Sequence, residues 1–369
     1  MKLWSLITLL FFLNFTALPG IASVFGWDMI RTNVVINEEE VETRYGSNHL
    51  IRQFLDVENN FHMSGFLEYQ YLFGKNEDKK NKIAAGYNGY AEYMKTSYRF
   101  VSGIPNGNQP ASIVNLNNID ASIQNDIANN NLSFIESTNG EYKTKLNNRV
   151  DGAYANLLVH VGEKFEITAG LRAENTIRDL KYRLIIDPIG SPYRKNLYEK
   201  LDVLPSLSVK YLVSETSNIR FAASRTITRP VLFETLPLTY INADGTSERG
   251  NENLINSTNT NVDLKFEIFP TKNELFAVTL FGKHIQDPIE RSFENFGGGS
   301  GRQVAYFNNK SATLFGAEFE AIIQLSRLTE NLEGLSFGVN TSLMYTEAIA
   351  DTERGSYFDT FEKRQLQGA

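Results

Sequence analysis

The period of the hydrophobic pattern constrains this chain most. In FEITAGLRAENT, residues 165–176, every second residue from Phe165 to Ala173 is apolar, and the residues between them are polar, charged or glycine. An extended chain places alternate side chains on opposite faces, so this stretch predicts a strand with one apolar and one polar face. The roughly ten residues of alternation match the length of a tilted strand that crosses a bilayer.

The same period of two recurs along the chain. Four further stretches alternate in this way: LPSLSVKYLV at 204–213, NVDLKFEIF at 261–269, TLFGAEFEAII at 313–323 and LSFGVNTSLMY at 335–345. Repeated alternation of this kind is typical of antiparallel strands with one wet face. The pattern therefore predicts an all-β protein.

The connections between the candidate strands alternate between short and long. Short polar turns are predicted at 74–82, 160–164, 214–218, 269–273 and 326–334, and long irregular segments at 96–145, 178–202, 229–258, 287–310 and after 347. A soluble sandwich has water at both ends and no reason to sort its loops. Outer-membrane barrels have short periplasmic turns and long extracellular loops.

We therefore expect an antiparallel transmembrane β-barrel of the outer-membrane type, with outer-membrane lipid against its apolar face. A closed barrel satisfies the backbone groups of every strand, which hydrocarbon cannot do. The polar face would line a wet lumen, where charged side chains stay solvated. The lumen-facing candidates are Glu166, Arg172, Glu174, Asp263, Lys265 and Glu267.

The N-terminus has a different composition. Residues 1–22 contain a single lysine, Lys2, followed by an apolar run from Leu3 to Leu18. The helix-breaking pair Pro19-Gly20 comes next, and a small-x-small sequence ends at Ala22. This order of features predicts a secretory signal peptide, with the barrel over 23–369. A membrane anchor or the buried first strand of a larger fold is the alternative.

Composition excludes several kinds of function. The chain has no cysteine and a net charge of −7, so Cys-based metal sites and nucleic-acid binding are not expected. Its four histidines have no metal-ligand spacing, and we find neither a phosphate-binding loop nor a Gly-x-Ser-x-Gly elbow. We predict no catalytic, cofactor-binding or metal-binding residue and no enzyme, although an outer-membrane hydrolase could assemble its site from neighbouring strands.

Several motifs in the second half of the chain resemble those of one family, the TonB-dependent outer-membrane receptors in the form common among Bacteroidetes-type bacteria. SRTITRPVLFE at 224–234, RGNENL at 249–254, FNNKSATLFGAEFE at 307–320 and RQLQG at 364–368 follow the family's order. The resemblance covers residues 45–369 and is strongest after 150.

Individual residues match the family's motifs. Arg225, Thr226, Arg229 and Pro230 fall on its Arg-Thr-x-x-Arg-Pro stretch; Gly250, Asn251, Asn253 and Leu254 fall on its Gly-Asn-Pro-Asn-Leu turn; Gly316, Glu318 and Glu320 fall on its Gly-x-Glu-x-Glu strand. Glu252 stands where the turn has proline, so the rigidity of that turn is in question.

The resemblance implies a receptor for TonB-dependent uptake of a scarce nutrient, such as a siderophore, a glycan or a peptide, powered by the TonB complex. Family members have a plug domain, a TonB-contacting segment and about 22 strands. We count about ten to twelve strands here and no plug-like or TonB-contacting sequence. We therefore expect a partial barrel that lacks the plug and the final strands and is inactive in active transport as this fragment.

The rival hypothesis is an intact small outer-membrane barrel that acts as a passive pore, an adhesin or an outer-membrane enzyme. It predicts a closed barrel, whereas the fragment hypothesis predicts unpaired strand edges at both ends of the sheet.

Overall fold

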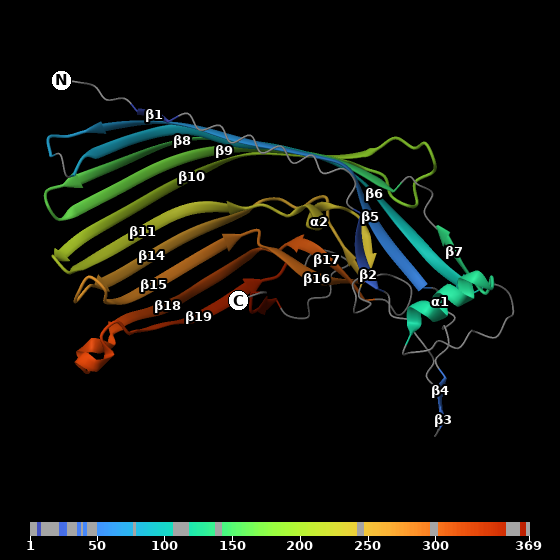
Figure 1. Cartoon of the computed structure of the whole chain (residues 1–369). Coiled ribbons are helices and arrows are strands. Elements are labelled where there is room, and N and C mark those ends of the chain that lie inside the picture. The colour runs from blue at the N-terminus through green and yellow to red at the C-terminus, as the bar shows by residue number, and fades with distance from the viewer. Residues whose placement is uncertain are drawn as a thin grey trace.

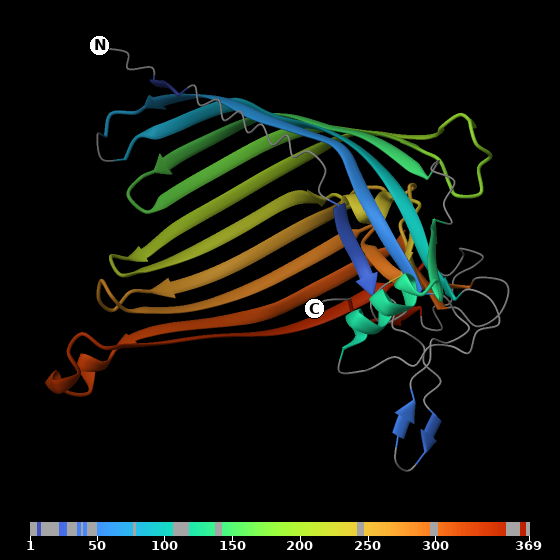
Figure 2. The same cartoon turned by 45° about the vertical axis from the view of Figure 1, so that its right-hand side comes forward.

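Ten long antiparallel strands build one curved sheet. The computed structural model describes residues 50–76, 79–105, 118–136, 142–241, 247–295, 302–351 and 362–366, and four short strands before residue 50. Each long strand pairs with the next one along the chain, and Figures 1 and 2 show the sheet curled into a trough. The long strands are β5 (Leu50–Phe73), β6 (Asn81–Pro105), β8 (Lys143–Val161), β9 (Phe165–Tyr182), β10 (Arg194–Ser214), β11 (Ser217–Thr228), β14 (Ser257–Ile268), β15 (Leu275–Gln286), β18 (Ser311–Gln324) and β19 (Ser336–Ile349).

Short strands extend this sheet at both edges and beside β6. β1 (Leu6–Thr8) and β2 (Ala22–Trp27) pair with β5, β7 (Leu132–Glu136) pairs with β6, and β20 (Lys363–Arg364) pairs with β19. The expectation of about ten to twelve long strands in an antiparallel sheet is confirmed. Among the described residues, no helix has the length and apolar character needed to cross a membrane.

The predicted sorting of connections is also confirmed. The turns after β5, β8, β10, β14 and β18 are short and gather at one end of the trough, while the long connections lie at the other end (Figure 1). Gly162, in the turn between β8 and β9, has a φ of 61°, a left-handed conformation that glycine adopts without a steric cost. The longest of the short turns carries two 3₁₀ helices, η1 (Leu325–Arg327) and η2 (Glu330–Leu332).

The long connections were expected to be irregular, and for the described parts this was wrong. β6 extends to Pro105, and two helices and several short strands lie beyond the long strands. The long connections are ordered because short strands within them pair with one another. β16 pairs with β17, and β17 also pairs with β13. The elements are α1 (Ile119–Ala128), α2 (Leu232–Thr235), β12 (Thr239–Ile241), β13 (Ser247–Arg249), β16 (Ile289–Asn295) and β17 (Arg302–Asn308), with a separate pair formed by β3 (Val35–Asn37) and β4 (Glu40–Glu42).

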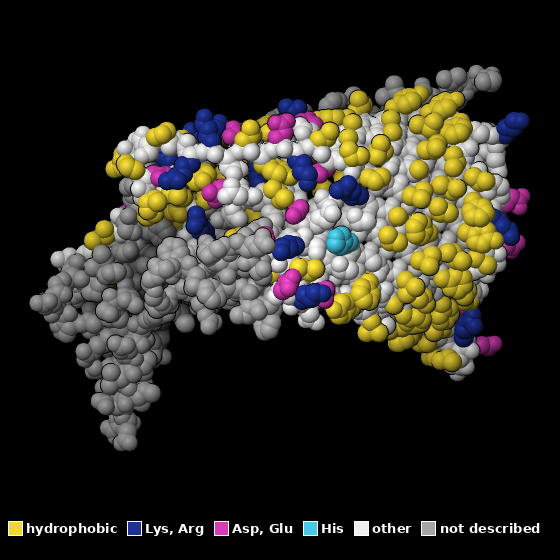
Figure 3. All heavy atoms as spheres, turned by 180° about the vertical axis from the view of Figure 1, so that it is seen from behind, with side chains coloured by type: hydrophobic (Ala, Val, Ile, Leu, Met, Phe, Trp, Pro, Cys, Tyr) yellow, Lys and Arg dark blue, Asp and Glu magenta, His cyan; other side chains and the backbone are white. Residues whose placement is uncertain are grey.

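The two faces of the main sheet differ in chemistry. Near the turns, the side chains of one face are apolar and exposed, as at Leu171 (55%), Leu280 (53%) and Phe315 (54%). Figure 3 shows this face with a broad band of hydrophobic side chains, bordered by charged groups toward the turns. We call it the outer face, and the opposite one the inner face.

The inner face is covered near the long connections by the protein itself. Segment 229–256 links β11 to β14, and its described residues 229–241 fold back over β6, β8 and β9. Its Leu236 and Leu238 join a buried cluster with Leu180 of β9, which is fully buried. The other members are Tyr98, Tyr142, Leu146 and Tyr182. Burial of this apolar surface holds the segment inside the trough.

Most of the predicted signal peptide, residues 1–22, lies outside the described residues. Only the backbone of β1 and the first residue of β2 are described there. The boundary at Ala22 remains a prediction.

A candidate ligand site on the inner face

All six predicted lumen-facing residues lie on the inner face. In β9, Glu166, Arg172 and Glu174 alternate with exposed apolar residues such as Leu171. The register carries this face across β10 and β11 to β14, where Asp263, Lys265 and Glu267 share it. The pleat of an antiparallel sheet puts directly paired residues on the same side, so one surface holds the whole set.

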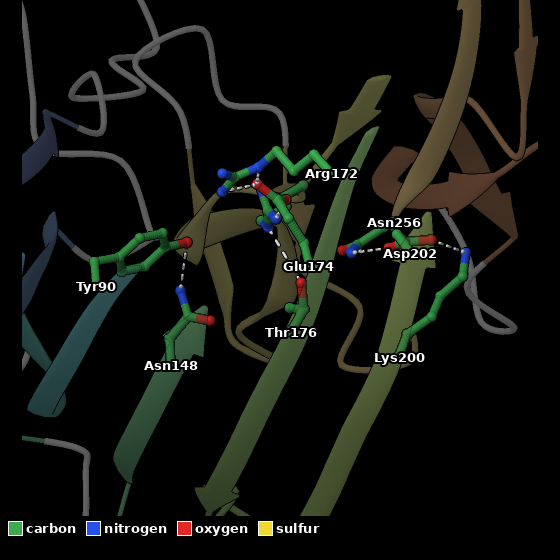
Figure 4. A network of polar contacts seen from close by, with 9 residues as sticks. Tyr90, Asn148, Arg172, Glu174, Thr176, Lys200, Asp202 and Asn256 are labelled. Atoms are coloured by element: carbon green, nitrogen blue, oxygen red, sulfur yellow. Dashed lines mark hydrogen bonds and ion pairs between the residues drawn. The ribbon is translucent and has the colours of Figure 1, made fainter. Parts of the chain in front are cut away.

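A charged network marks the middle of the inner face. The guanidinium of Arg172 donates from Nε to Glu174 Oε1 at 2.5 Å, and Arg229 donates from Nη2 to the other carboxylate oxygen of Glu174. Arg229 also donates from Nε to Thr176 Oγ1 at 3.4 Å. Glu174 is only 8% exposed, and two cations offset the cost of burying its charge. Figure 4 shows Arg172, Glu174 and Thr176 converging on one place.

This network connects the wall to segment 229–256. Glu174 belongs to β9, whereas Arg229 follows the last residue of β11 and begins the segment that folds inward. Pro230 comes next and precedes α2. The second arginine of the Arg-Thr-x-x-Arg-Pro stretch, Arg229, therefore lies where the wall ends and segment 229–256 begins.

The Gly-Asn-x-Asn-Leu turn lies inside the trough and is held from several sides. Asn251 donates its backbone N–H to the Glu234 carbonyl at 2.6 Å and its side-chain amide to the Tyr306 carbonyl at 2.9 Å. A Cβ on Gly250 would overlap the carbonyl oxygens of Leu236 and Phe233, so only glycine fits. Asn253 accepts from Asn196 of β10 at 3.0 Å, and Leu254 is 1% exposed.

Glu252, which replaces the family's proline, connects this turn to β9. Its carboxylate accepts a hydrogen bond of 2.8 Å from the hydroxyl of Tyr182 in β9. That contact ties the turn to the wall, whereas the family's proline would fix its φ angle.

Arg178 of β9 supports the same turn. It is 6% exposed, donates to the carbonyl of Leu254 and stacks over the ring of Tyr198 at 5.0 Å. On the neighbouring β10, Asp202 pairs with Lys200 at 3.3 Å and accepts from Asn256 at 3.5 Å (Figure 4). Two inner-face side chains of the wall, Arg178 and Asp202, thus contact residues 254–256.

The carboxyl of Glu234 in α2 stays close to its own helix. It accepts from the backbone N–H of Val231 at 2.8 Å. Burial raises the pKa of Glu234 above its ordinary value, while the bond from Val231 opposes that rise.

Two pockets of about 490 and 530 Å³ adjoin the charged network. Tyr154, Arg172, Glu174 and Arg229 line both of them. The first pocket extends toward β10 and β11 through Ser206 and Ser224, and the second extends toward β5 and β6 through Ser64, Asn88 and Tyr90. The shared residues offer two guanidinium groups and one carboxylate, an arrangement that can hold an anionic or hydroxyl-rich small molecule by charge-assisted hydrogen bonds.

A second group of inner-face charges lies nearer the turns. Arg220 of β11 pairs with Glu267 at 2.8 Å, and Lys265 lies 3.2 Å from Glu267 and 3.7 Å from Glu320 of β18. Asp263 and Glu318 lie on the same face, and Gly316 is where a Cβ would meet Phe281 and Leu343. This group is separate from the pockets.

Not every motif residue reaches the network. Arg225 lies on the outer face because it alternates with Thr226, whose hydroxyl accepts from Asn261 at 3.3 Å on the inner face. Sequence reasoning missed Arg178, Tyr182 and Asp202 as supports of the inner turn. The signal available was Leu236, Leu238 and Leu254, which are apolar residues in a segment that we had assigned to an external loop.

Comparison with known proteins agrees with this architecture. The family model described as "TonB dependent receptor-like, beta-barrel" matches residues 14–368. The ferric citrate transporter FecA in the unliganded form is 13% identical, with a TM-score of 0.53 over 84% of this chain and 38% of its own. That likeness shows the fold. No curated protein matches the chain in sequence.

Two other solved structures overlap with most of the chain. The siderophore receptor PirA from Pseudomonas aeruginosa is 15% identical, with a TM-score of 0.38 over 89% of this chain and 67% of its own. The FrpB iron transporter from Neisseria meningitidis is 11% identical, with a TM-score of 0.42 over 90% and 50%. The chain thus spans between 38% and 67% of these three proteins.

Proposed function

Since this chain belongs to the TonB-dependent receptor family of outer-membrane β-barrels, we propose that it forms the wall of a receptor that binds a scarce small nutrient. It is an outer-membrane protein of the receptor and transporter kind. A siderophore, a glycan or a peptide is the nutrient class we propose, with uptake driven by the TonB complex. The narrower Bacteroidetes-type resemblance stays a prediction.

The observation that carries the proposal is the network of Arg172, Glu174 and Arg229 between the two pockets. Two arginines around one carboxylate leave a net positive charge beside cavities of about 500 Å³ each, which is within the usual size of a small-molecule site. Hydroxyl and amide groups from Ser64, Asn88 and Tyr154 line the second pocket and could orient a polar ligand. We therefore favour a ligand that presents an anionic group to Arg172 and Arg229.

The hydrocarbon of the outer membrane would cover the apolar outer face. A band of exposed leucine, valine and phenylalanine side chains in water would be costly, and the hydrocarbon of a bilayer removes that cost. The inner-face charges Glu166, Asp263 and Lys265 would then face the lumen.

The test measures binding by the full chain refolded in detergent. The probes are radio-iron ferric citrate, a labelled oligosaccharide and a labelled tripeptide, each titrated over wild type, R172Q/R229Q and K283Q. Lys283 is the control because it lies on the inner face of β15, outside both pockets. A heat-modifiable gel shift confirms that each variant folds.

We expect saturable binding of at least one probe and a loss of affinity of about tenfold or more in R172Q/R229Q, with K283Q unchanged. Steady ion conductance in a planar bilayer, with no saturable binding of any probe, would favour the rival passive pore and contradict the proposal.

A further inference from the structure

A third pocket, of about 520 Å³, lies among the long connections and shares no residue with the two pockets beside the charged network. The Gly-Asn-x-Asn-Leu turn forms one side of it, and Asp287 and the end of β17 form the other. Asn251 of the turn donates to the carbonyls of Glu234 in α2 and Tyr306 in β17, so the turn lies between these two elements (Figure 1). We call this cavity the turn pocket.

The pairing of β13 puts Arg249 into the turn pocket without a carboxylate partner. Arg249 pairs in register with Ala305 of the parallel β17, so both residues share the face of the small sheet that lines the pocket. The preceding residue, Glu248, is on the opposite face, where it accepts from the hydroxyl of Tyr306 and lies 3.7 Å from Arg291. The Arg249 guanidinium makes no hydrogen bond and no ion pair within the described part of the chain.

Asp287 lines the same pocket with an unpaired carboxylate. The residue follows β15 with a φ of 52°, and contacts hold its backbone there, because Ser257 Oγ and Asn308 Nδ2 both donate to its carbonyl at 2.8 Å. Left-handed backbone at a residue other than glycine depends on such surrounding contacts and is concentrated at functional sites. Among the described residues, the Asp287 carboxylate has no hydrogen-bond donor and no cation as a partner.

Most other polar groups that line the pocket are already used within the protein. Asn308 accepts from the backbone N–H of Ile255 at 2.9 Å and donates to the carbonyls of Ile255 and Asp287. The side-chain carbonyls of both asparagines of the turn accept hydrogen bonds from the protein, and so does the carboxylate of Glu252. The unused bonding capacity of the pocket is therefore concentrated in two opposite charges, Arg249 and Asp287, which do not pair with each other.

We propose that the turn pocket binds a short peptide with free ends, whose carboxylate pairs with Arg249 and whose ammonium group pairs with Asp287. This inference rests on the proposed function and selects the peptide from the three nutrient classes. Hydrogen bonds between two charged groups are stronger than those to a neutral hydroxyl, so unpaired charges of both signs in one pocket favour a ligand that carries both signs. A glycan would offer these two side chains only neutral hydroxyls.

The rest of the lining suits an apolar side chain of the peptide. Ile255, Ala305 and Phe307 add apolar surface to the pocket. Apolar lining with a few placed polar groups is typical of small-molecule sites, and a volume of about 520 Å³ lies within their usual range. Pockets of this size hold drug-sized ligands, so we expect a tripeptide with an apolar middle residue to bind better than a single amino acid.

The experiment measures binding to the full chain in detergent by isothermal titration calorimetry. The probes are the tripeptide Ala-Leu-Ala with free ends, its N-acetylated form, its C-terminal amide and free leucine, with ferric citrate and an oligosaccharide titrated in parallel. D287N removes one charge and keeps a residue type that tolerates positive φ. R249Q removes the other charge, and R249K keeps it. D263N and K283Q are the matched controls, because both residues are on the inner face outside the turn pocket.

We expect wild type to bind the free tripeptide at least about tenfold more tightly than either blocked form or leucine, because a site built for a charged partner rejects a ligand that lacks it. D287N should weaken the free peptide about tenfold and leave the N-acetylated form unchanged. R249Q should weaken the free peptide about tenfold and leave the amide unchanged. R249K and both controls should change the affinity by less than about threefold.

Equal affinity for free and blocked peptides overturns the inference, and this comparison uses wild type alone, so it does not depend on the folding of any variant. Unchanged affinity in D287N and R249Q, leucine binding as tight as that of the tripeptide, or an oligosaccharide affinity that both variants reduce would also overturn it. Binding of ferric citrate or the oligosaccharide without the tripeptide overturns this inference alone. The absence of binding by every probe contradicts the proposed function as well.

Discussion

Two leucines of one strand show how the two faces of this wall differ. Leu171 and Leu180 both belong to β9, nine residues apart, so they point to opposite faces. Leu171 is 55% exposed on the outer face, and Leu180 is fully buried on the inner face under Leu236 and Leu238. The same residue type therefore relies on lipid at one position and on the protein's own segment 229–256 at the other.

The difference extends to the charges. On the inner face, Glu174 is buried but held by Arg172 and Arg229. On the outer face, the apolar band itself has few charges, and charged side chains lie along its two borders. The surroundings of each face, more than its residue content, decide which substitutions the wall accepts.

Removal of the buried leucine should have the largest effect. L180A should lower the free energy of unfolding by about 2–5 kcal/mol, because it leaves a cavity under segment 229–256. Denaturant unfolding followed by far-UV circular dichroism measures this loss. The control L180M, which keeps the volume of the side chain, should cost less than about 1.5 kcal/mol. An L180A protein as stable as wild type would mean that the segment does not pack on the wall.

A charge on the outer face should cost nearly as much. L171R should lower the stability of the barrel in lipid vesicles by about 2–4 kcal/mol, because it places a cation in the hydrocarbon. T168R, on the inner face of the same strand, is the control and should be milder. Equal stability of wild type and L171R in vesicles would break the assignment of the outer face to lipid.

A methyl group in the inner turn should have a smaller effect. G250A should cost about 1–3 kcal/mol, because the added Cβ overlaps the carbonyl oxygens of Leu236 and Phe233. G282A is the matched control, since nothing lies within 4 Å of a Cβ built there. Faster proteolysis of segment 229–256 in G250A, compared with G282A, would locate the damage. Identical cleavage of both variants would contradict the packing described for Gly250.

The smallest effect should be on the pH dependence of stability, through Glu274 in the turn between β14 and β15. Glu274 accepts from Arg327 at 2.7 and 2.8 Å, and these bonds lower the pKa of Glu274 from 4.5 to about 2. A carboxyl with a depressed folded pKa stabilises the fold above its unfolded pKa, so this contribution is complete above pH 4.5 and is lost as the pH falls toward 2. E274Q should flatten the dependence of stability on pH within that window. An unchanged pH profile in E274Q would show that the contact contributes nothing.

Local patterns predicted the wall well. The alternation in 165–176 and 261–269 gave the strands and their inner faces, and the short polar stretches gave the turns. The strand ends were less accurate, since β9 continues to Tyr182 and β10 begins at Arg194, inside a segment expected to be irregular. Charged and tyrosine side chains at these strand ends break the alternation, so the sequence pattern gives no sign of the paired backbone.

The inward fold of segment 229–256 could not be predicted in this way. Arg229 was identified from a motif, but its partner Glu174 is 55 residues earlier in the chain. The contacts of Tyr182 with Glu252 and of Arg178 with Leu254 likewise join residues more than 60 positions apart. Local periodicity contains no information on such pairs, which depend on the curvature of the whole sheet.

The most direct test of the account is a cysteine scan along β9, which the absence of native cysteine makes possible. Single variants E166C, I167C, T168C and A169C would be placed in lipid vesicles and treated with a water-soluble maleimide or labelled and exposed to brominated lipid. We predict that the maleimide modifies positions 166 and 168, and that brominated lipid quenches labels at 167 and 169. Equal reaction at all four positions would contradict a wall with one face in lipid and the other in water.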